Sequence, residues 1–94
     1  MEKETKDLLE ELKSVADDFY QNRNNKGIKR MPEIIRDLSD FMTCLKSEDQ
    51  PEYLVILKGV MEAMETKNYI MLADMLVFDV VEVMERYETE HNGR

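Results

Sequence analysis

The segment YIMLADMLVFDVVEVM, residues 69–84, decides between the structural classes open to this chain. A membrane-spanning helix needs about 20 mainly apolar residues, and this segment is shorter and carries three carboxylates. At about 100° per residue, most of its apolar side chains fall on one half of a helix and its charges on the other. A strand would instead place Asp79 on the same face as Val77 and Val81. The segment therefore predicts an amphipathic helix of a soluble protein, with Ile70 on its core side.

Two earlier segments carry narrower apolar stripes with the same helical period. One lies in residues 5–22 and the other in residues 28–45. The second stripe passes Pro32 without changing phase, although proline normally disrupts a helix interior. The helix therefore either begins close to Pro32 or is kinked, begins near Asn25 and carries Pro32 on its outer side. The unbroken phase favours the kinked helix.

The third helix has a well-marked expected start. Asp49 can cap it, Pro51 suits its first turn, and Glu52 stands three residues after the cap, as in a capping box. Gly59 lies near the edge of the apolar stripe of this helix. Because glycine has no side chain, a neighbouring helix could approach closely at that position.

Short links connect these helices. Residues 66–68 alone separate the third helix from the last, and Asn68 is a good N-cap. Short links place successive helices side by side and antiparallel, so we expect an all-α, up-down-up-down four-helix bundle. It forms one domain over residues 1–94 with a flexible tail at about residues 89–94. The expected core consists of Leu12, Phe19, Leu38, Phe41, Leu57, Val60, Leu76 and Val80.

The residues that carry most enzyme chemistry are absent or isolated in this sequence. Cys44 is the only cysteine, which excludes an intrachain disulfide and a cysteine zinc cluster and favours its interpretation as a packing thiol. His91 is the only histidine and stands in the expected tail. Without a nucleophile–base set or a glycine-rich phosphate loop, we expect no enzymatic activity, no metal and no cofactor. No apolar run follows Met1, so a cytoplasmic location fits best.

The charge balance of the chain limits the kinds of partner that the protein is expected to bind. Twenty-one acidic against thirteen basic residues give a net charge of −8, which repels nucleic acid and anionic lipid. The basic stretch RNNKGIKR, residues 23–30, has no interleaved aromatic residue of the kind that stacks on bases. We therefore expect a protein partner rather than nucleic acid or a membrane.

The last helix has more apolar residues than one bundle face requires. Met71, Met75 and Phe78 recur on its charged half and form a second stripe with Glu82 at its edge. Such spacing is typical of the anchors that seat a helix in a partner's groove. The sequence favours a non-enzymatic interaction module, first a homodimer and next a complex with another protein. The simpler alternative is that a neighbouring helix of the same chain covers the stripe.

A different class of function is also compatible with the sequence. Tyr53, Tyr69 and Asp74 could line an internal pocket of a small-molecule-binding or regulatory bundle. Asp74 and Asp79 lie five residues apart and so point in different directions on a helix, which excludes a catalytic carboxylate pair. We expect each of them to border the core and to bond a lysine, arginine or tyrosine of another helix.

The stretch KNYIMLADMLVFDV, residues 67–80, carries a resemblance to other proteins. It resembles the pattern Lys-Asp-Tyr, Leu-Ala-Asp and Leu-Glu-Tyr-Glu-Leu of uncharacterised short bacterial helical-bundle proteins. The matching residues are Lys67, Tyr69, Leu72, Ala73, Asp74 and Leu76. The resemblance implies a bacterial, cytoplasmic helical bundle without a known activity.

Overall fold

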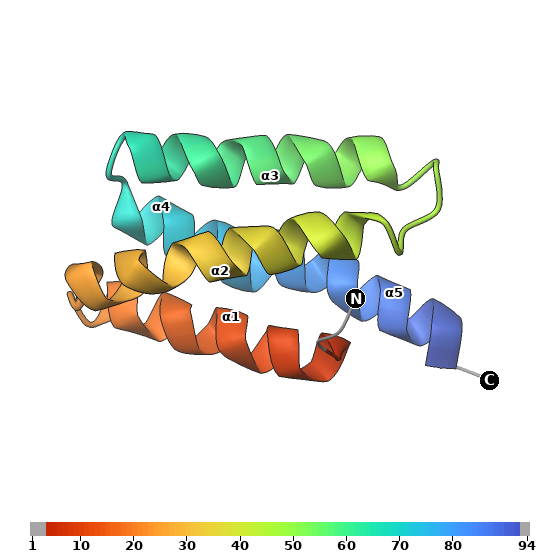
Figure 1. The fold of residues 1–94 in the computed structure, drawn as a ribbon, viewed down its shortest axis with the longest axis horizontal. Helices are drawn as coiled ribbons and strands as arrows, with labels where there is room; N and C mark the ends of the chain where they lie inside the picture. The colour runs from red at the N-terminus through yellow and green to blue at the C-terminus, as the bar shows by residue number, and fades with distance from the viewer. Residues whose placement is uncertain (1–3, 93–94) are drawn as a thin grey trace.

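Four helices form the fold in the computed structural model, which describes residues 4–92, with side chains to residue 90. Their bounds are α1 (Thr5–Tyr20), α2 (Asn24–Met42), α3 (Gln50–Glu65) and a last helix in three consecutive parts, α4 (Tyr69–Asp74), the π-helical segment η1 (Met75–Val80) and α5 (Val81–Asn92). Figure 1 shows successive helices running in opposite directions, with α5 reaching beyond the end of the other three. The expected all-α fold of four helices is confirmed.

One hydrophobic core joins the four helices. The helix α1 packs against α2 and α4, and α3 packs against α2 and the α4–η1 segment, so the last helix lies between α1 and α3. All eight residues expected in the core are buried, namely Leu12, Phe19, Leu38, Phe41, Leu57, Val60, Leu76 and Val80. The helical periodicity of the sequence thus identifies core residues in each of the four helices. None of the described helices combines the length and the apolar content needed to cross a membrane.

The helix α1 ends two residues earlier than its apolar stripe predicts, because a left-handed residue terminates it. Asn22 has a φ of 63°, and its N–H donates to the Phe19 carbonyl at 3.1 Å, while the Arg23 N–H donates to the Asp18 carbonyl at 2.7 Å. These two bonds form a Schellman motif, in which asparagine tolerates the left-handed conformation better than most residues. The helix α3 ends with the same pattern at Lys67, whose φ is 58°.

The helix α2 begins one residue before the expected start and continues through Pro32, which is exposed. The expectation of a helix that carries Pro32 on its outer side is therefore confirmed. Near the start of this helix, Gly27 lies against α1. A Cβ atom at Gly27 would stand 2.7 Å from two ring atoms of Phe19, so only glycine permits this approach without a shift.

The expected capping box of α3 does not form. Asp49 has near-helical angles (φ −91°, ψ −18°), and its side chain accepts no cap hydrogen bond. A residue in that conformation continues the preceding turn and does not point its carboxylate at the free N–H groups of the helix. The Gln50 side chain instead donates to the Leu45 carbonyl at 3.2 Å, and Pro51 occupies the first turn as expected.

The last helix begins as expected and ends later than expected. The Asn68 side-chain oxygen accepts from the Met71 N–H at 3.3 Å, which confirms its interpretation as an N-cap. The helix α5 continues to Asn92, so residues 89–92 of the expected tail are helical, and the flexibility of the tail stays a prediction. An ion pair between Lys46 and Glu90 (3.7 Å) ties this end of α5 to the loop between α2 and α3. Residues 93–94 lie outside the described part of the chain.

Candidate interaction surface

A π-helical turn in the middle of the last helix affects which side chains lie on its outer side. In an α-helix every fourth residue drifts by about 40°, because one turn takes 3.6 residues. A π turn holds one additional residue, which sets the following residues back by about 100°. The segment η1 therefore offsets part of the drift, and the four residues Ile70, Asp74, Phe78 and Glu82, spaced by four, are all exposed.

The outer side of this helix exposes large apolar side chains. Ile70 is 52% exposed, Met71 50% and Phe78 65%. We name these three residues, with Glu82 at their C-terminal end and Met75 at their edge, the α4–η1 face. The expectation that Ile70 belongs to the core is wrong, since α4 turns it to solvent. The expected positions of Met71 and Phe78 on the outer half agree with their exposure.

Met75 differs from its two companions because α3 covers part of it. Its side chain is half-buried, and its methyl group occupies the space that a Cβ atom at Gly59 would take. The expected close approach at Gly59 is therefore confirmed. Of the three apolar residues in the expected second stripe, Met71 and Phe78 are exposed, while Met75 packs against Gly59 of α3.

Asp74 links the α4–η1 face to α1. The Tyr20 hydroxyl donates to Asp74 Oδ1 at 2.5 Å. Partial burial of the phenol and the neighbouring carboxylate raise the pKa of Tyr20 to about 12. The expectation that Asp74 bonds a tyrosine of another helix is confirmed. The Asp79 side chain is exposed and forms no hydrogen bond or ion pair with another described residue, although we expected it to bond a side chain of another helix.

The two ends of the α4–η1 face carry opposite charges. Lys67 stands just before α4, and Glu82 follows η1; both are exposed, and neither forms an ion pair with another described residue. Arg86, one turn beyond Glu82, is paired with Glu52 of α3 at 2.8 Å. The face is thus positive at its N-terminal end and negative at its C-terminal end.

The three residues expected to line a pocket lie in three separate environments. Tyr53 is fully buried and donates its hydroxyl to the Leu38 carbonyl at 2.7 Å, and its burial raises its pKa. Tyr69 stacks on the ring of Phe19, with 5.6 Å between centroids. Asp74 is at the surface. The structure therefore does not bring these residues together around one cavity.

Two depressions lie elsewhere, on α5. The first, of about 40 Å³, lies between α5 and the loop that joins α2 to α3, and the second is an open, mostly acidic stretch of the α5 surface. A cavity of about 40 Å³ is far below the roughly 300–1,000 Å³ of a typical small-molecule site. Neither depression involves the residues of the expected pocket, since their linings consist of Leu45, Asp49, Glu82, Val83, Glu85, Arg86, Tyr87, Thr89 and Glu90.

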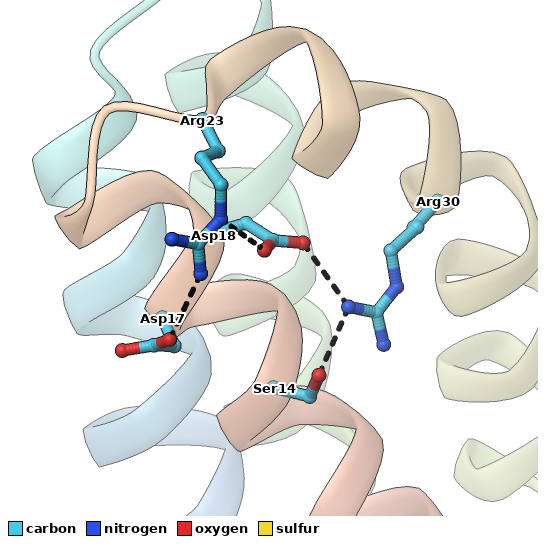
Figure 2. Close-up of polar contacts among 5 residues, drawn as sticks. All are labelled: Ser14, Asp17, Asp18, Arg23 and Arg30. Atoms are coloured by element: carbon cyan, nitrogen blue, oxygen red, sulfur yellow. Dashed lines mark hydrogen bonds and ion pairs between the residues drawn. The ribbon is translucent and has the colours of Figure 1, made fainter.

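The basic stretch at residues 23–30 contributes to an ion-pair cluster around Asp18 (Figure 2). Arg23 Nε donates to Asp18 Oδ1 and Arg30 Nη1 to Asp18 Oδ2, both at 3.1 Å. Arg30 also donates to Ser14 Oγ at 3.0 Å, and Arg23 to Asp17 Oδ2 at 3.1 Å. These contacts join the last turns of α1 to the first turns of α2.

Asp18 is the centre of this cluster, and sequence reasoning missed it. Its side chain is only 4% exposed. Burial alone would raise its pKa, but the hydrogen bonds from Arg23 and Arg30, together with the positive charges of Lys26 and Arg23, outweigh that effect and hold the pKa below its ordinary value. Two arginines of the basic stretch are therefore engaged by carboxylates of the same chain. This arrangement gives the stretch a structural role between α1 and α2.

The residues considered for metal or thiol chemistry offer no assembled site in the described part of the chain. No group of three histidine, cysteine, aspartate or glutamate residues is placed to hold a metal ion among the described residues. Cys44 is half-buried, in agreement with its expected role in packing. The side chain of His91 lies outside the described residues.

The chain matches a family model over residues 1–90 and belongs to that family, described as a domain of unknown function, DUF8042. No curated protein and no solved structure matches the chain. An uncharacterised family agrees with the resemblance seen in residues 67–80, whereas the bacterial origin implied by that resemblance stays a prediction.

Proposed function

We propose that this protein is a non-enzymatic interaction module that forms a homodimer through the α4–η1 face, with Met71, Met75, Phe78 and Glu82 as its partner-binding residues. The observation that carries the proposal is the exposure of Phe78, at 65%, beside Met71 on one helix face. Burial of a phenylalanine or methionine side chain contributes about 1.5–3 kcal/mol. A second protein surface that covers the face would bury these side chains, and this free energy would stabilise the complex relative to the isolated chain.

The arrangement of these residues distinguishes them from ordinary exposed apolar side chains. Single apolar residues are common on protein surfaces and need no partner. Here Ile70, Met71 and Phe78 are all at least half exposed within about two turns of one helix, so three large apolar side chains lie close together on its surface. A symmetric dimer is the commonest way in which proteins cover such a surface.

The proposed setting is the cytoplasm of a bacterium. The resemblance of residues 67–80 to short bacterial proteins supports the origin, and the single cysteine, Cys44, supports a reducing compartment. The proposed role is one of binding, which fits a sequence with a single cysteine and a single histidine and described side chains that assemble no group of three metal ligands.

The test is the mass of the protein in solution, measured by sedimentation equilibrium for the wild type and for the double variant Met71→Lys, Phe78→Lys. We expect a wild-type dimer and a variant monomer with unchanged helicity. Met61→Lys is the matched control, because Met61 is 53% exposed but lies on α3, outside the face. We expect this control to remain dimeric.

Four results would contradict the proposal. The wild type could be a monomer at every concentration measured, the double variant could stay dimeric, or Met61→Lys could dissociate the dimer as strongly as the double variant. Loss of helicity in the double variant would assign Met71 and Phe78 to the fold and would also overturn it.

A further inference from the structure

We propose, on the basis of the proposed function, that the occupant of the α4–η1 face is a second copy lying antiparallel across a two-fold axis between Asp74 and Met75. In this arrangement Met71 packs on Phe78 of the partner subunit. Lys67 then faces Glu82 of the partner subunit.

The positions of two pairs of residues support this register. Met71 and Phe78 are equally far from the Asp74–Met75 peptide along the chain, and so are Lys67 and Glu82. A two-fold axis exchanges such positions, since in an isologous interface residue i contacts residue j and j contacts i. One axis therefore satisfies the apolar pair and the charged pair together. Lys67 lies in the turn just before α4, and Glu82 lies in the first turn of α5, so the charged pair stands outside the apolar pair on both sides of the axis.

The distribution of charge selects the antiparallel direction. The N-terminal end of the face carries Lys67, whereas its C-terminal end carries Asp79 and Glu82. Parallel pairing would bring like charges together at both ends, which is unfavourable. Antiparallel pairing sets each lysine against Glu82 of the partner subunit. The face carries a positive and a negative charge at symmetric positions, so it is complementary to a second copy of itself. A different partner with a uniformly basic helix would bring like charge against Lys67.

The acidic residue nearest the axis is already satisfied within each chain. The Asp74 carboxylate accepts the Tyr20 hydroxyl of α1, which holds it toward that helix. The net charge of −8 on each copy opposes association in general, so the ion pairs at the two ends have to direct it. Exchanging those charges is accordingly the sharpest test of the register.

The experiment measures the dimer dissociation constant for Lys67→Glu, for Glu82→Lys and for the double exchange. By symmetry each single variant replaces two attractive pairs by two repulsive ones, and we expect each to weaken the dimer by about tenfold. The double exchange restores both pairs with inverted sign, and we expect it to return the constant to near the wild-type value.

Matched controls separate the register from the change in net charge. Lys29→Glu and Glu10→Lys alter the net charge as the two single variants do, but they lie on α2 and α1, away from the face, at exposed positions. We expect these controls to leave the constant nearly unchanged. Helicity is recorded for every variant.

The outcomes distinguish the register from the proposed function. Suppose that the wild type is a dimer and that the Met71→Lys, Phe78→Lys variant is a monomer. If the charge exchanges then leave the dissociation constant unchanged, or the double exchange does not restore it, the register is refuted and the proposed function is kept. Equal effects of the control variants also refute the register. A wild-type monomer at all concentrations refutes both.

Discussion

Replacing Gly27 by alanine tests the closest contact between α1 and α2. A Cβ atom at this position would lie 2.7 Å from two atoms of the Phe19 ring. That ring has little freedom to move, because Phe19 is fully buried and stacks on Tyr69 with an interplanar angle of 2°. The added methyl group therefore forces a shift in either the ring stack or the spacing of the two helices.

Two opposing contributions set the size of the effect. Alanine is better than glycine in a helix by about 0.8–1.0 kcal/mol. Overpacking a well-filled core costs about 1–3 kcal/mol. We therefore expect Gly27→Ala to lower the free energy of unfolding by up to about 2 kcal/mol, despite the better helix propensity of alanine.

Gly59→Ala is the matched control, because it has the same propensity gain and a different neighbour. Its new Cβ atom would meet the terminal methyl group of Met75, which is flexible and half-buried and can rotate away. We expect this variant to be as stable as the wild type or more stable by up to about 1 kcal/mol.

Thermal melts followed by circular dichroism compare the three proteins. One kcal/mol corresponds to about 4–8 °C in Tm for a domain of this size. Gly27→Ala should melt below the wild type and Gly59→Ala at or above it. A Gly27→Ala variant as stable as Gly59→Ala would refute the reasoning, since it would show that the Phe19 ring yields without cost.

The inner faces of the helices were predictable because burial follows one period along each helix. Leu12 in α1, Leu38 in α2, Leu57 in α3 and Leu76 in the last helix are all buried as expected. Asn68 was predictable as a cap for a local reason, since an asparagine between two apolar runs has few other roles. These features depend on residues close together in the sequence.

The features that could not be predicted depend on contacts between distant residues. Asp18 follows another aspartate in the sequence, as a residue of a solvent-exposed turn would, and its pairing arises only when α2 brings Arg30 against it. Asp49 has the composition of a cap, but the turn before α3 gives it helical angles. Ile70 is in phase with the core of an ideal helix, yet it is exposed. In each case tertiary packing overrode the local preference.

The π turn explains why the candidate face was only partly predictable. An ideal helix of constant pitch places Met71, Met75 and Phe78 on one stripe. The sequence indicates that this stripe is additional to the apolar face that the core requires. The turn η1 changes the phase within that stripe. It leaves Met75 against Gly59, and Phe78 is exposed, as Ile70 is. The surplus of apolar residues was visible in advance, and their division between α3 and solvent was not.

Three further predictions test the packing and the ionisable groups. Leu76→Ala should lower the free energy of unfolding by about 2–5 kcal/mol through a cavity in the core, and an unchanged melting curve would show that Leu76 is misplaced. Because the pKa of Asp18 is lowered in the folded state, its charge stabilises the fold above about pH 4 and that contribution is lost at lower pH. Asp18→Asn should therefore be less stable than the wild type near neutral pH, with a gap in unfolding free energy that narrows below pH 4; a gap independent of pH would contradict this. The pKa of Tyr20 is raised to about 12, so its bond to Asp74 stabilises the fold below pH 10 and is lost as the pH rises toward 12. The pKa of Tyr20 is measured by absorbance titration, from which the titration of the Tyr20→Phe variant is subtracted. Asp74→Asn should lower the pKa of Tyr20 but leave it above 10, because burial persists when the charge is removed. An unchanged pKa would show that the carboxylate has no part in the shift.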